Sequence, residues 1–297
     1  MERIAIVGAG LIGRAWAIVF ARAGRPVALF DPIAGAAGRA LDLIDQSLSD
    51  LADFGLIAES PALIRARITA CDSLVDALTG VAYVQENAPE TLAVKQKLFA
   101  ELDRLAPPDA ILASSTSSIP GSEFTKNLPG RRRCIVAHPV NPPHLVPLVE
   151  LVPAPWTAPD VCARARALLE AVGQSPITLS REIEAFVLNR LQGALLAEAF
   201  RLVEDGYVST ADLDKTLKDG LGLRWSFMGP FETIDLNAPG GVRDYIERYG
   251  GVYYALAKAQ ADPRPWGTAL VERIEAERRA ELPAERLGER QIGRAHV

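Results

Sequence analysis

The sequence predicts an α/β fold in which a doubly wound, mostly parallel sheet comes first and an all-α domain follows. Two observations support this prediction. Short apolar runs of strand length alternate with helical patterns as far as Leu179, as in a parallel sheet whose strands are joined by crossover helices. From Ala185 onward the patterns are helical only. We therefore expect a first domain over residues 1–182 and a second over residues 183–291.

Each element is bounded by glycine, proline or polar residues. Gly55, for example, ends a long helical pattern, and Pro107 ends another. In the second domain a strongly apolar helix runs from about Ala185 to Glu204, and Thr210 to Asp214 forms the capped start of the next. The expected strands are residues 4–7, 27–30, 64–69, 83–85, 110–113, 134–137, 148–152 and 175–179, and the expected helices of the first domain are residues 12–24, 34–54, 74–78, 92–105 and 160–172.

A glycine-rich turn follows the first strand and fits G-x-G-x-x-G. It runs through Gly8, Gly10, Leu11, Ile12 and Gly13, and the second strand ends in Asp31. Strand, glycine turn, helix, strand and acid together indicate a Rossmann dinucleotide site, with the pyrophosphate on the helix N-terminus. A carboxylate at Asp31 would accept a hydrogen bond from the ribose 2′-hydroxyl and would repel a 2′-phosphate. NAD is therefore expected as the cofactor rather than NADP. The alternative is a βαβ turn whose glycines serve packing alone.

The composition argues against several classes of protein. A net charge of −5 and 49% hydrophobic residues indicate neither a nucleic-acid nor a membrane partner, and no apolar run approaches a membrane span. The cysteines Cys71, Cys134 and Cys162 are scattered, so we expect no metal site and a cytoplasmic location. Because the first strand begins almost at Met1, we expect no targeting peptide before it.

Polar clusters follow three of the expected strands, at residues 86–90, 114–118 and 138–141. Functional groups of doubly wound sheets gather at the carboxyl ends of strands. His138 directly follows an apolar strand, and imidazole is suited to remove a proton from an alcohol near neutral pH. Glu150 could hold that ring and stabilise its charged form. The alternative for His138 is a buried histidine satisfied by a backbone partner.

Five stretches resemble the 3-hydroxyacyl-CoA dehydrogenase superfamily, and most closely its lambda-crystallin and L-gulonate 3-dehydrogenase branch. They cover nearly the whole chain in order. The stretches are V-Q-E-N-A-P-E, S-S-T-S-S, I-V-A-H-P-V-N-P-P-H-L-V-P-L-V-E-L-V-P, F-V-L-N-R-L-Q and D-G-L-G-L-R-W-S-F-M-G-P-F-E-T.

The resemblance implies a role for each matching residue. His138 matches the catalytic base and Glu150 its partner, while Ser117 and Asn189 match the residues that hydrogen-bond the reacting oxygen. The structural alternatives are that Ser117 only caps a helix and that Asn189 only makes a hydrogen bond in helix packing. Glu90 and Lys95 match positions that contact the NAD ribose and nicotinamide region, and Asn141 matches an asparagine on the cofactor side. Arg224 matches an arginine thought to bind the substrate carboxylate, and the alternative is a surface or helix-terminal arginine.

The resemblance also implies the reaction, oxidation of the secondary alcohol of a 3-hydroxy acid by NAD⁺. A coenzyme A ester needs cations for its phosphates, yet residues 32–59, the expected coenzyme A region, hold no lysine and one arginine, Arg39. We therefore expect a free L-3-hydroxy acid, with L-gulonate first. L-Carnitine and 3-hydroxyacyl-CoA, a substrate of fatty acid metabolism, remain alternatives, as does a non-catalytic crystallin-like or NAD-binding protein. The family also implies a homodimer through the all-α domain.

The last residues depart from the family pattern. Residues 285–291 fit the approach to a further helix, whereas Ile292 to Val297 do not. These six residues match one frame of a common sequencing adapter, so we expect a non-native tail and exclude His296 from any site.

Overall fold

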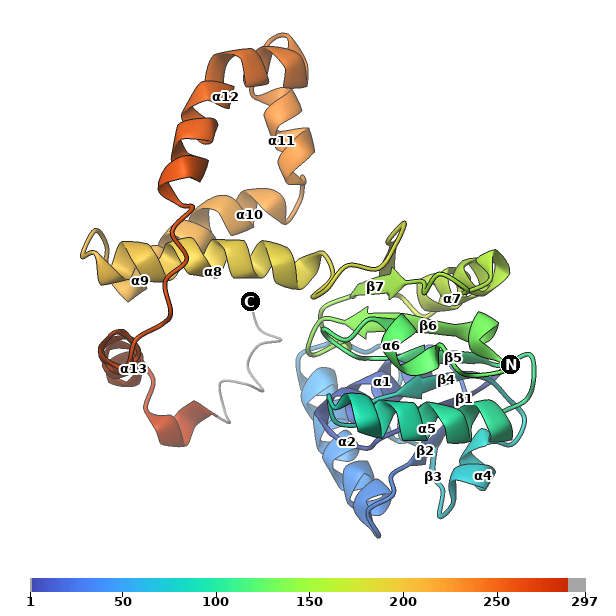
Figure 1. Cartoon of the computed structure of the whole chain (residues 1–297). Helices are drawn as coiled ribbons and strands as arrows, with labels where there is room; N and C mark the ends of the chain where they lie inside the picture. The colour runs from blue at the N-terminus through green and yellow to red at the C-terminus, as the bar shows by residue number, and fades with distance from the viewer. Residues whose placement is uncertain (1, 288–297) are drawn as a thin grey trace. The chain divides into compact units, whose positions relative to one another are not determined.

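The computed structural model describes residues 2–287, drawn in Figure 1. They form two compact units that divide between Asn189 and Arg190. The tail expected at residues 292–297, with His296, lies outside the described residues. No helix among those described is long and apolar enough to cross a membrane.

Within residues 2–287, one sheet of eight strands forms the centre of the first unit, in the order β3-β2-β1-β4-β5-β6-β7-β8. All neighbouring pairs in this sheet are parallel except β6 and β7. The doubly wound, mostly parallel sheet is therefore confirmed. The strand order reverses between β1 and β4, which is where such sheets bind their ligands. The strands are β1 Arg3–Val7, β2 Val27–Phe30, β3 Ile68–Ala70, β4 Val81–Glu86, β5 Ile111–Ser114, β6 Cys134–Pro139, β7 Leu148–Val152 and β8 Ser175–Thr178.

Helices cover both faces of this sheet because successive side chains of a strand point to opposite faces. Ile4 and Ile6 of β1 belong to one buried cluster, which contains the apolar faces of α1, α2 and α7. Ala5 and Val7 belong to the other, beneath α4, α5 and α6. The helices of this unit are α1 Leu11–Arg22, α2 Ala36–Asp53, α3 Pro61–Arg65, α4 Leu74–Leu78, α5 Leu92–Leu105, α6 Gly121–Thr125 and α7 Pro159–Ala171.

The predicted strand at residues 64–69 is wrong in its first half. Ile64 lies in α3, because the Ser60 hydroxyl accepts a hydrogen bond from the Leu63 N–H and Pro61 occupies the first turn. A serine cap followed by proline is a strong helix start, and the strand begins only at Ile68. The cap of α9 also differs by one residue from the prediction, since Ser209 rather than Thr210 caps it.

The second unit is helical over its described residues, 190–287, as predicted. Its long helix α8 begins at Leu188 rather than near Ala185. Arg201 of α8 donates to the backbone oxygens of Ala259, Gln260 and Asp262, at the end of α12 and just beyond it. Helices α11 and α12 follow each other in the chain and contact one another (Figure 1). The helices are α8 Leu188–Glu204, α9 Thr210–Lys215, α10 Gly222–Trp225, α11 Pro230–Leu236, α12 Gly241–Ala259 and α13 Thr268–Glu281.

Candidate active site

The three glycines of the motif meet different constraints: Gly8 and Gly10 lie between β1 and α1, and Gly13 lies in the first turn of α1. Gly8 has a φ of +97°, and a Cβ there would lie 2.7 Å from the Asn87 backbone oxygen. A Cβ on Gly13 would lie 1.8 Å from the Gly8 backbone oxygen, so α1 packs directly on the turn. A Cβ on Gly10 would meet nothing within 4 Å. The space beside Gly10 is therefore open for a phosphate group to approach the backbone.

The N-terminus of α1 faces this open space with its peptide groups. Gly10 is the cap residue and no side chain caps the helix. The N–H groups of Leu11, Ile12 and Gly13 belong to the first turn, where a helix has no acceptor of its own for them. Such a helix start attracts an anion through both its free donors and its dipole.

Asp31 at the end of β2 is held in place by two backbone groups. Its Oδ2 accepts from the Ala9 N–H at 2.8 Å and its Oδ1 from the Ile33 N–H at 2.9 Å. The first bond ties the carboxylate to the glycine turn itself. Asp31 thus lies where the fingerprint places the ribose acid, and it also stabilises the turn.

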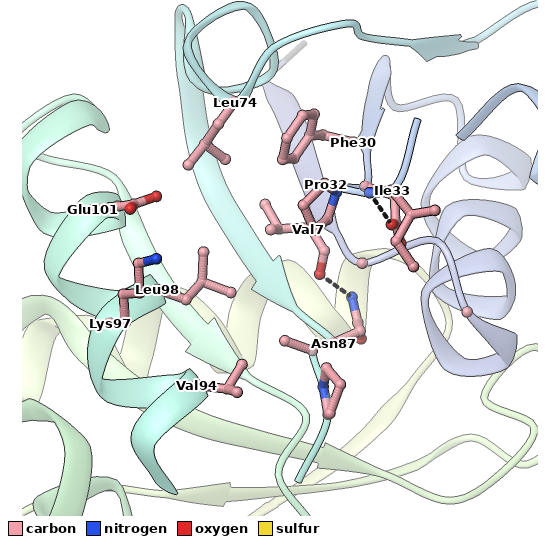
Figure 2. A pocket seen from close by; sticks show the side chains of 15 residues that line it. Val7, Phe30, Pro32, Ile33, Leu74, Asn87, Val94, Lys97, Leu98 and Glu101 are labelled. Atoms are coloured by element: carbon pink, nitrogen blue, oxygen red, sulfur yellow. Dashed lines mark hydrogen bonds between the residues drawn. The ribbon is translucent and has the colours of Figure 1, made fainter. Parts of the chain in front are cut away.

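A cavity of about 700 Å³ opens beside the glycine turn (Figure 2). Gly8, Gly10 and Asp31 line one side of it. Its other walls come from β2, from the chain after β4 and from α4 and α5, and they are largely apolar. An adenosine group needs apolar walls for its base and a carboxylate for its ribose. The remaining lining residues are Val7, Phe30, Pro32, Ile33, Leu74, Asn87, Ala88, Pro89, Val94, Lys97, Leu98 and Glu101.

Lys95 of α5 is buried beside the carboxyl end of β4, with 1% of its surface exposed. Its Nζ lies 3.0 Å from Glu86 Oε1 and 3.7 Å from Glu90 Oε2. Glu86 is fully buried and also accepts a hydrogen bond from the Ser114 hydroxyl at 2.5 Å. Lys95 therefore bridges two carboxylates, and through Glu86 it is tied to the end of β5.

Glu90 organises the serine-rich turn after β5. Its Oε1 accepts hydrogen bonds from the Thr116 hydroxyl, from the Ser117 N–H and from both the N–H and the hydroxyl of Ser118. Burial raises the pKa of Glu90, but the Thr116 hydroxyl, the charge of Lys95 and the two backbone groups outweigh it, so the pKa lies below its usual value. Glu90 is therefore an ionised anchor for the backbone of Ser117.

His138 and Glu150 face each other across the antiparallel pair of β6 and β7, where they are register partners. The His138 Nδ1 lies 2.8 Å from Glu150 Oε2. His138 is 7% exposed and Glu150 is fully buried. The other oxygen, Oε1, accepts from the N–H groups of Val187 and Leu188 at 2.8 and 2.9 Å. Glu150 thus binds the imidazole with one oxygen and caps the start of α8 with the other.

The protonation of this pair follows from its hydrogen bonds. Burial raises the pKa of Glu150, but the bonds from His138, Leu188 and Val187 outweigh it and hold the pKa below its usual value. An ionised Glu150 can only accept, so the neutral imidazole carries its proton on Nδ1. That tautomer leaves Nε2 with a free lone pair, as a general base needs.

Two further predicted residues meet beside the serine-rich turn. The Asn189 Nδ2 donates to the Ser117 backbone oxygen at 2.9 Å, and both residues belong to the first unit. Asn141 is exposed in the loop between β6 and β7. Arg224 lies in α10 of the second unit, so the structure does not join it to the residues above.

The sequence reasoning missed three kinds of residue. Glu86 was in a flagged polar cluster, but only its buried partner Lys95 was named. Phe186 falls within the helix expected from Ala185 to Glu204, whereas it precedes α8 and is fully buried against the ring of His138. A hydrogen-bonded group beneath the strand ends was also missed: Ser115 accepts from Trp16 and Gln85 and donates to Asn87. Polar residues at strand ends were the sequence signal for Glu86 and Ser115, and no such signal pointed to Phe186.

Comparisons with known proteins agree with this geometry. The model of the 3-hydroxyacyl-CoA dehydrogenase NAD-binding domain matches residues 3–183, and that of the C-terminal domain matches residues 186–282. The chain belongs to the 3-hydroxyacyl-CoA dehydrogenase family. It is accordingly an NAD-dependent dehydrogenase, and the open glycine turn, the helix N-terminus and Asp31 fit NAD.

Relatives in this family carry several names. A lambda-crystallin homolog of Mus musculus is 44% identical over 94% of this chain and 88% of its own length. An L-carnitine dehydrogenase of Streptomyces coelicolor is 38% identical over 84% of this chain and 78% of its own. Among solved structures, a 5-formyl-3-hydroxy-2-methylpyridine 4-carboxylic acid 5-dehydrogenase, described as an NAD⁺-dependent dismutase, has a TM-score of 0.79 at 28% identity and covers 93% of this chain and 87% of its own.

Two alanine substitutions in the glycine turn should separate folding from cofactor binding. In Gly13→Ala the new methyl would collide with the Gly8 backbone, so we expect a loss of about 3 kcal/mol of unfolding free energy. In Gly10→Ala nothing is displaced, so stability should change by less than about 0.5 kcal/mol. Its methyl would nevertheless occupy the phosphate approach and weaken NADH binding about tenfold or more. Urea unfolding and NADH fluorescence titration measure these effects, and equal stability losses would contradict the difference between the two glycines.

The depressed pKa of Glu150 predicts a pH-dependent contribution to stability. Because the folded-state pKa lies below the usual 4.5, the contribution is fully present above that pH and is lost as the pH falls through the folded value. Glu150→Gln cannot ionise. Its deficit in unfolding free energy relative to wild type should therefore be largest above pH 4.5 and shrink on further acidification. Urea titrations at a series of pH values test this, and a deficit independent of pH would count against it.

Proposed function

We propose that this dehydrogenase oxidises the secondary alcohol of a free L-3-hydroxy acid, and that L-gulonate is its leading substrate. The observation that supports the reaction best is the His138–Glu150 pair. A histidine with Nδ1 fixed on an ionised carboxylate presents Nε2 as a base, and it lies on the same sheet as the NAD-binding turn.

Each residue has a role in this proposal. His138 Nε2 removes the hydroxyl proton, and Glu150 stabilises the resulting imidazolium. Bound NAD⁺ supplies the hydride acceptor. The Ser117 hydroxyl, which has no partner among residues 2–287, and the Asn189 side chain beside it bind the oxygen as it becomes a carbonyl. Glu90 and Lys95, which also hold the Ser117 turn, contact the ribose and nicotinamide side of the cofactor. Asn141 lies on the cofactor side, and Arg224 binds the substrate carboxylate.

The charge of the α2 region favours a free acid over a coenzyme A ester. Residues 32–59 hold five carboxylates and a single arginine, Arg39. The resemblance places coenzyme A of the acyl-CoA enzymes on this stretch, and its phosphates would meet a repulsive field there. Lambda-crystallin homologs are among the relatives at 44% identity, and L-carnitine dehydrogenases among those at 38%. L-Carnitine is accordingly the second candidate.

A substrate panel tests the proposal. NADH absorbance would be followed with L-gulonate, L-3-hydroxybutyrate, L-carnitine and 3-hydroxybutyryl-CoA. We expect the highest kcat/KM with L-gulonate, and His138→Gln should lower kcat about 10²–10⁴-fold, because a positioned base contributes that much. NADH affinity should not change in this variant. Preferred turnover of the coenzyme A ester would overturn the free-acid assignment, and retained NADH binding without turnover of any substrate would overturn the enzymatic one.

We further propose a cytoplasmic homodimer formed through residues 183–291, with residues 1–182 as its cofactor domain. The free cysteines Cys71, Cys134 and Cys162 favour a reducing compartment. The 19-residue helix α12 has no buried residue, and Val252 and Tyr253 on it are 59% and 56% exposed. Exposed apolar and aromatic side chains on one helix indicate an interaction surface, and a second copy of the chain is the partner most often found for one.

Sedimentation velocity tests the dimer. Wild-type protein should sediment at twice the chain mass of 31.9 kDa, and Val252→Asp should shift it toward the monomer because a carboxylate cannot be buried unpaired in an apolar interface. Leu43→Asp is the matched control, because Leu43 is likewise an exposed apolar residue on a helix, α2, and is 44% exposed. This variant should stay dimeric, since α2 lies outside the proposed interface. A monomeric wild type would rule the proposal out.

A further inference from the structure

Phe186 covers the ring of the histidine that the proposed function makes the base. Its side chain is fully buried, and its ring centroid lies 5.5 Å from that of His138 with the planes tilted by 52°. It also belongs to the apolar cluster beneath β1, β4, β5 and β6. The imidazole is thus bounded by a carboxylate on its Nδ1 edge and by an aromatic ring beside it.

An unusual backbone conformation places Phe186 there. Ala185 and Phe186 have φ values of +59° and +53°, and they are the only non-glycine residues with positive φ within residues 2–287. Side chains disfavour this left-handed region, and two such residues in succession are costly to hold. Strain of this kind persists where the surroundings fix it, and it is found preferentially at functional sites.

The same two residues connect Phe186 to Glu150. Immediately after the left-handed pair, the N–H groups of Val187 and Leu188 donate to Glu150 Oε1. The same strained turn therefore places the Phe186 ring against His138 and directs two backbone N–H groups at Glu150. A phenylalanine that only filled the core would need neither a left-handed backbone nor contacts with both His138 and the segment that binds Glu150.

We propose that Phe186 is a positioning residue that fixes the imidazole of His138 and shields its hydrogen bond to Glu150 from water. Two contacts at different parts of the ring restrict its rotation, so Nε2 keeps one direction. Exclusion of water strengthens the Nδ1–H to Oε2 bond. The proposal rests on the function assigned to His138, yet it concerns a property of the cofactor-free protein that can be measured without turnover.

The test compares Phe186→Leu with Phe99→Leu. Phe99 is also fully buried and belongs to the same apolar cluster, but its aromatic partner is Phe124, with centroids 4.7 Å apart. Both variants lose an equal volume from one core. The readout is the downfield proton resonance of His138 Nδ1–H in cofactor-free protein, assigned by its disappearance in His138→Gln.

We expect wild type and Phe99→Leu to show this resonance. In Phe186→Leu it should broaden or vanish, because exchange with water becomes about tenfold faster or more. Where a substrate is turned over, kcat of Phe186→Leu should fall about tenfold while KM for NAD⁺ stays unchanged, and Phe99→Leu should keep both values.

Three results would overturn the positioning role. They are a resonance that survives in Phe186→Leu, one that is lost equally in Phe99→Leu, and one absent from wild type. If no 3-hydroxy acid is oxidised but the resonance depends on Phe186 alone, the proposed function fails and the positioning of His138 by Phe186 stands.

Discussion

The antiparallel register of β6 and β7 is the constraint on which the site depends. All other neighbouring strands of the described sheet are parallel, and a parallel β7 would need a crossover connection that puts Glu150 elsewhere. Reversal after the short loop at residues 140–147 sets His138 directly opposite Glu150. A slip of one residue would turn one of the two side chains to the other face of the sheet. The contact between His138 and Glu150 therefore depends on the pairing of β6 with β7 as well as on the two residues themselves.

Glu150 extends this constraint beyond the sheet. Its two oxygens are divided between the histidine ring and the first peptide groups of α8. A buried carboxylate with fewer partners would be costly and would take up a proton. Complete hydrogen bonding keeps it charged, and a charged Glu150 in turn fixes the tautomer of His138. Glu90, which follows β4, is held in the same way, because Lys95 and four hydrogen bonds from the turn after β5 keep it ionised. Backbone N–H groups donate to both Glu90 and Glu150, and the types of the side chains in the sequence do not show where such groups will point.

This dependence on backbone explains what the sequence could and could not predict. Apolar runs and glycines are local signals, so the sheet, the glycine turn and Asp31 were predictable, and polar residues after strands led to His138 and Glu90. Ile64 was misplaced because a local cap at Ser60 outweighed its β-branched side chain. The left-handed pair Ala185 and Phe186 carries no glycine, so its pattern is that of a helix. Its conformation is imposed by tertiary contacts with Glu150 and His138 and could not be inferred from the chain alone.

The structure also shows why cofactor choice and turn geometry are inseparable in this chain. Asp31 accepts one hydrogen bond from Ala9, within the glycine turn, and one from Ile33, just after β2. Each oxygen has a second lone pair left for a ribose hydroxyl. Replacing the carboxylate to admit a 2′-phosphate would also release the Ala9 N–H, next to the uncapped start of α1. A change of cofactor would therefore need a new acceptor for Ala9 as well as a cation for the phosphate. The acid at the end of β2 therefore holds the glycine turn in place, and the selection of NAD that we predict for it would act through the same carboxylate.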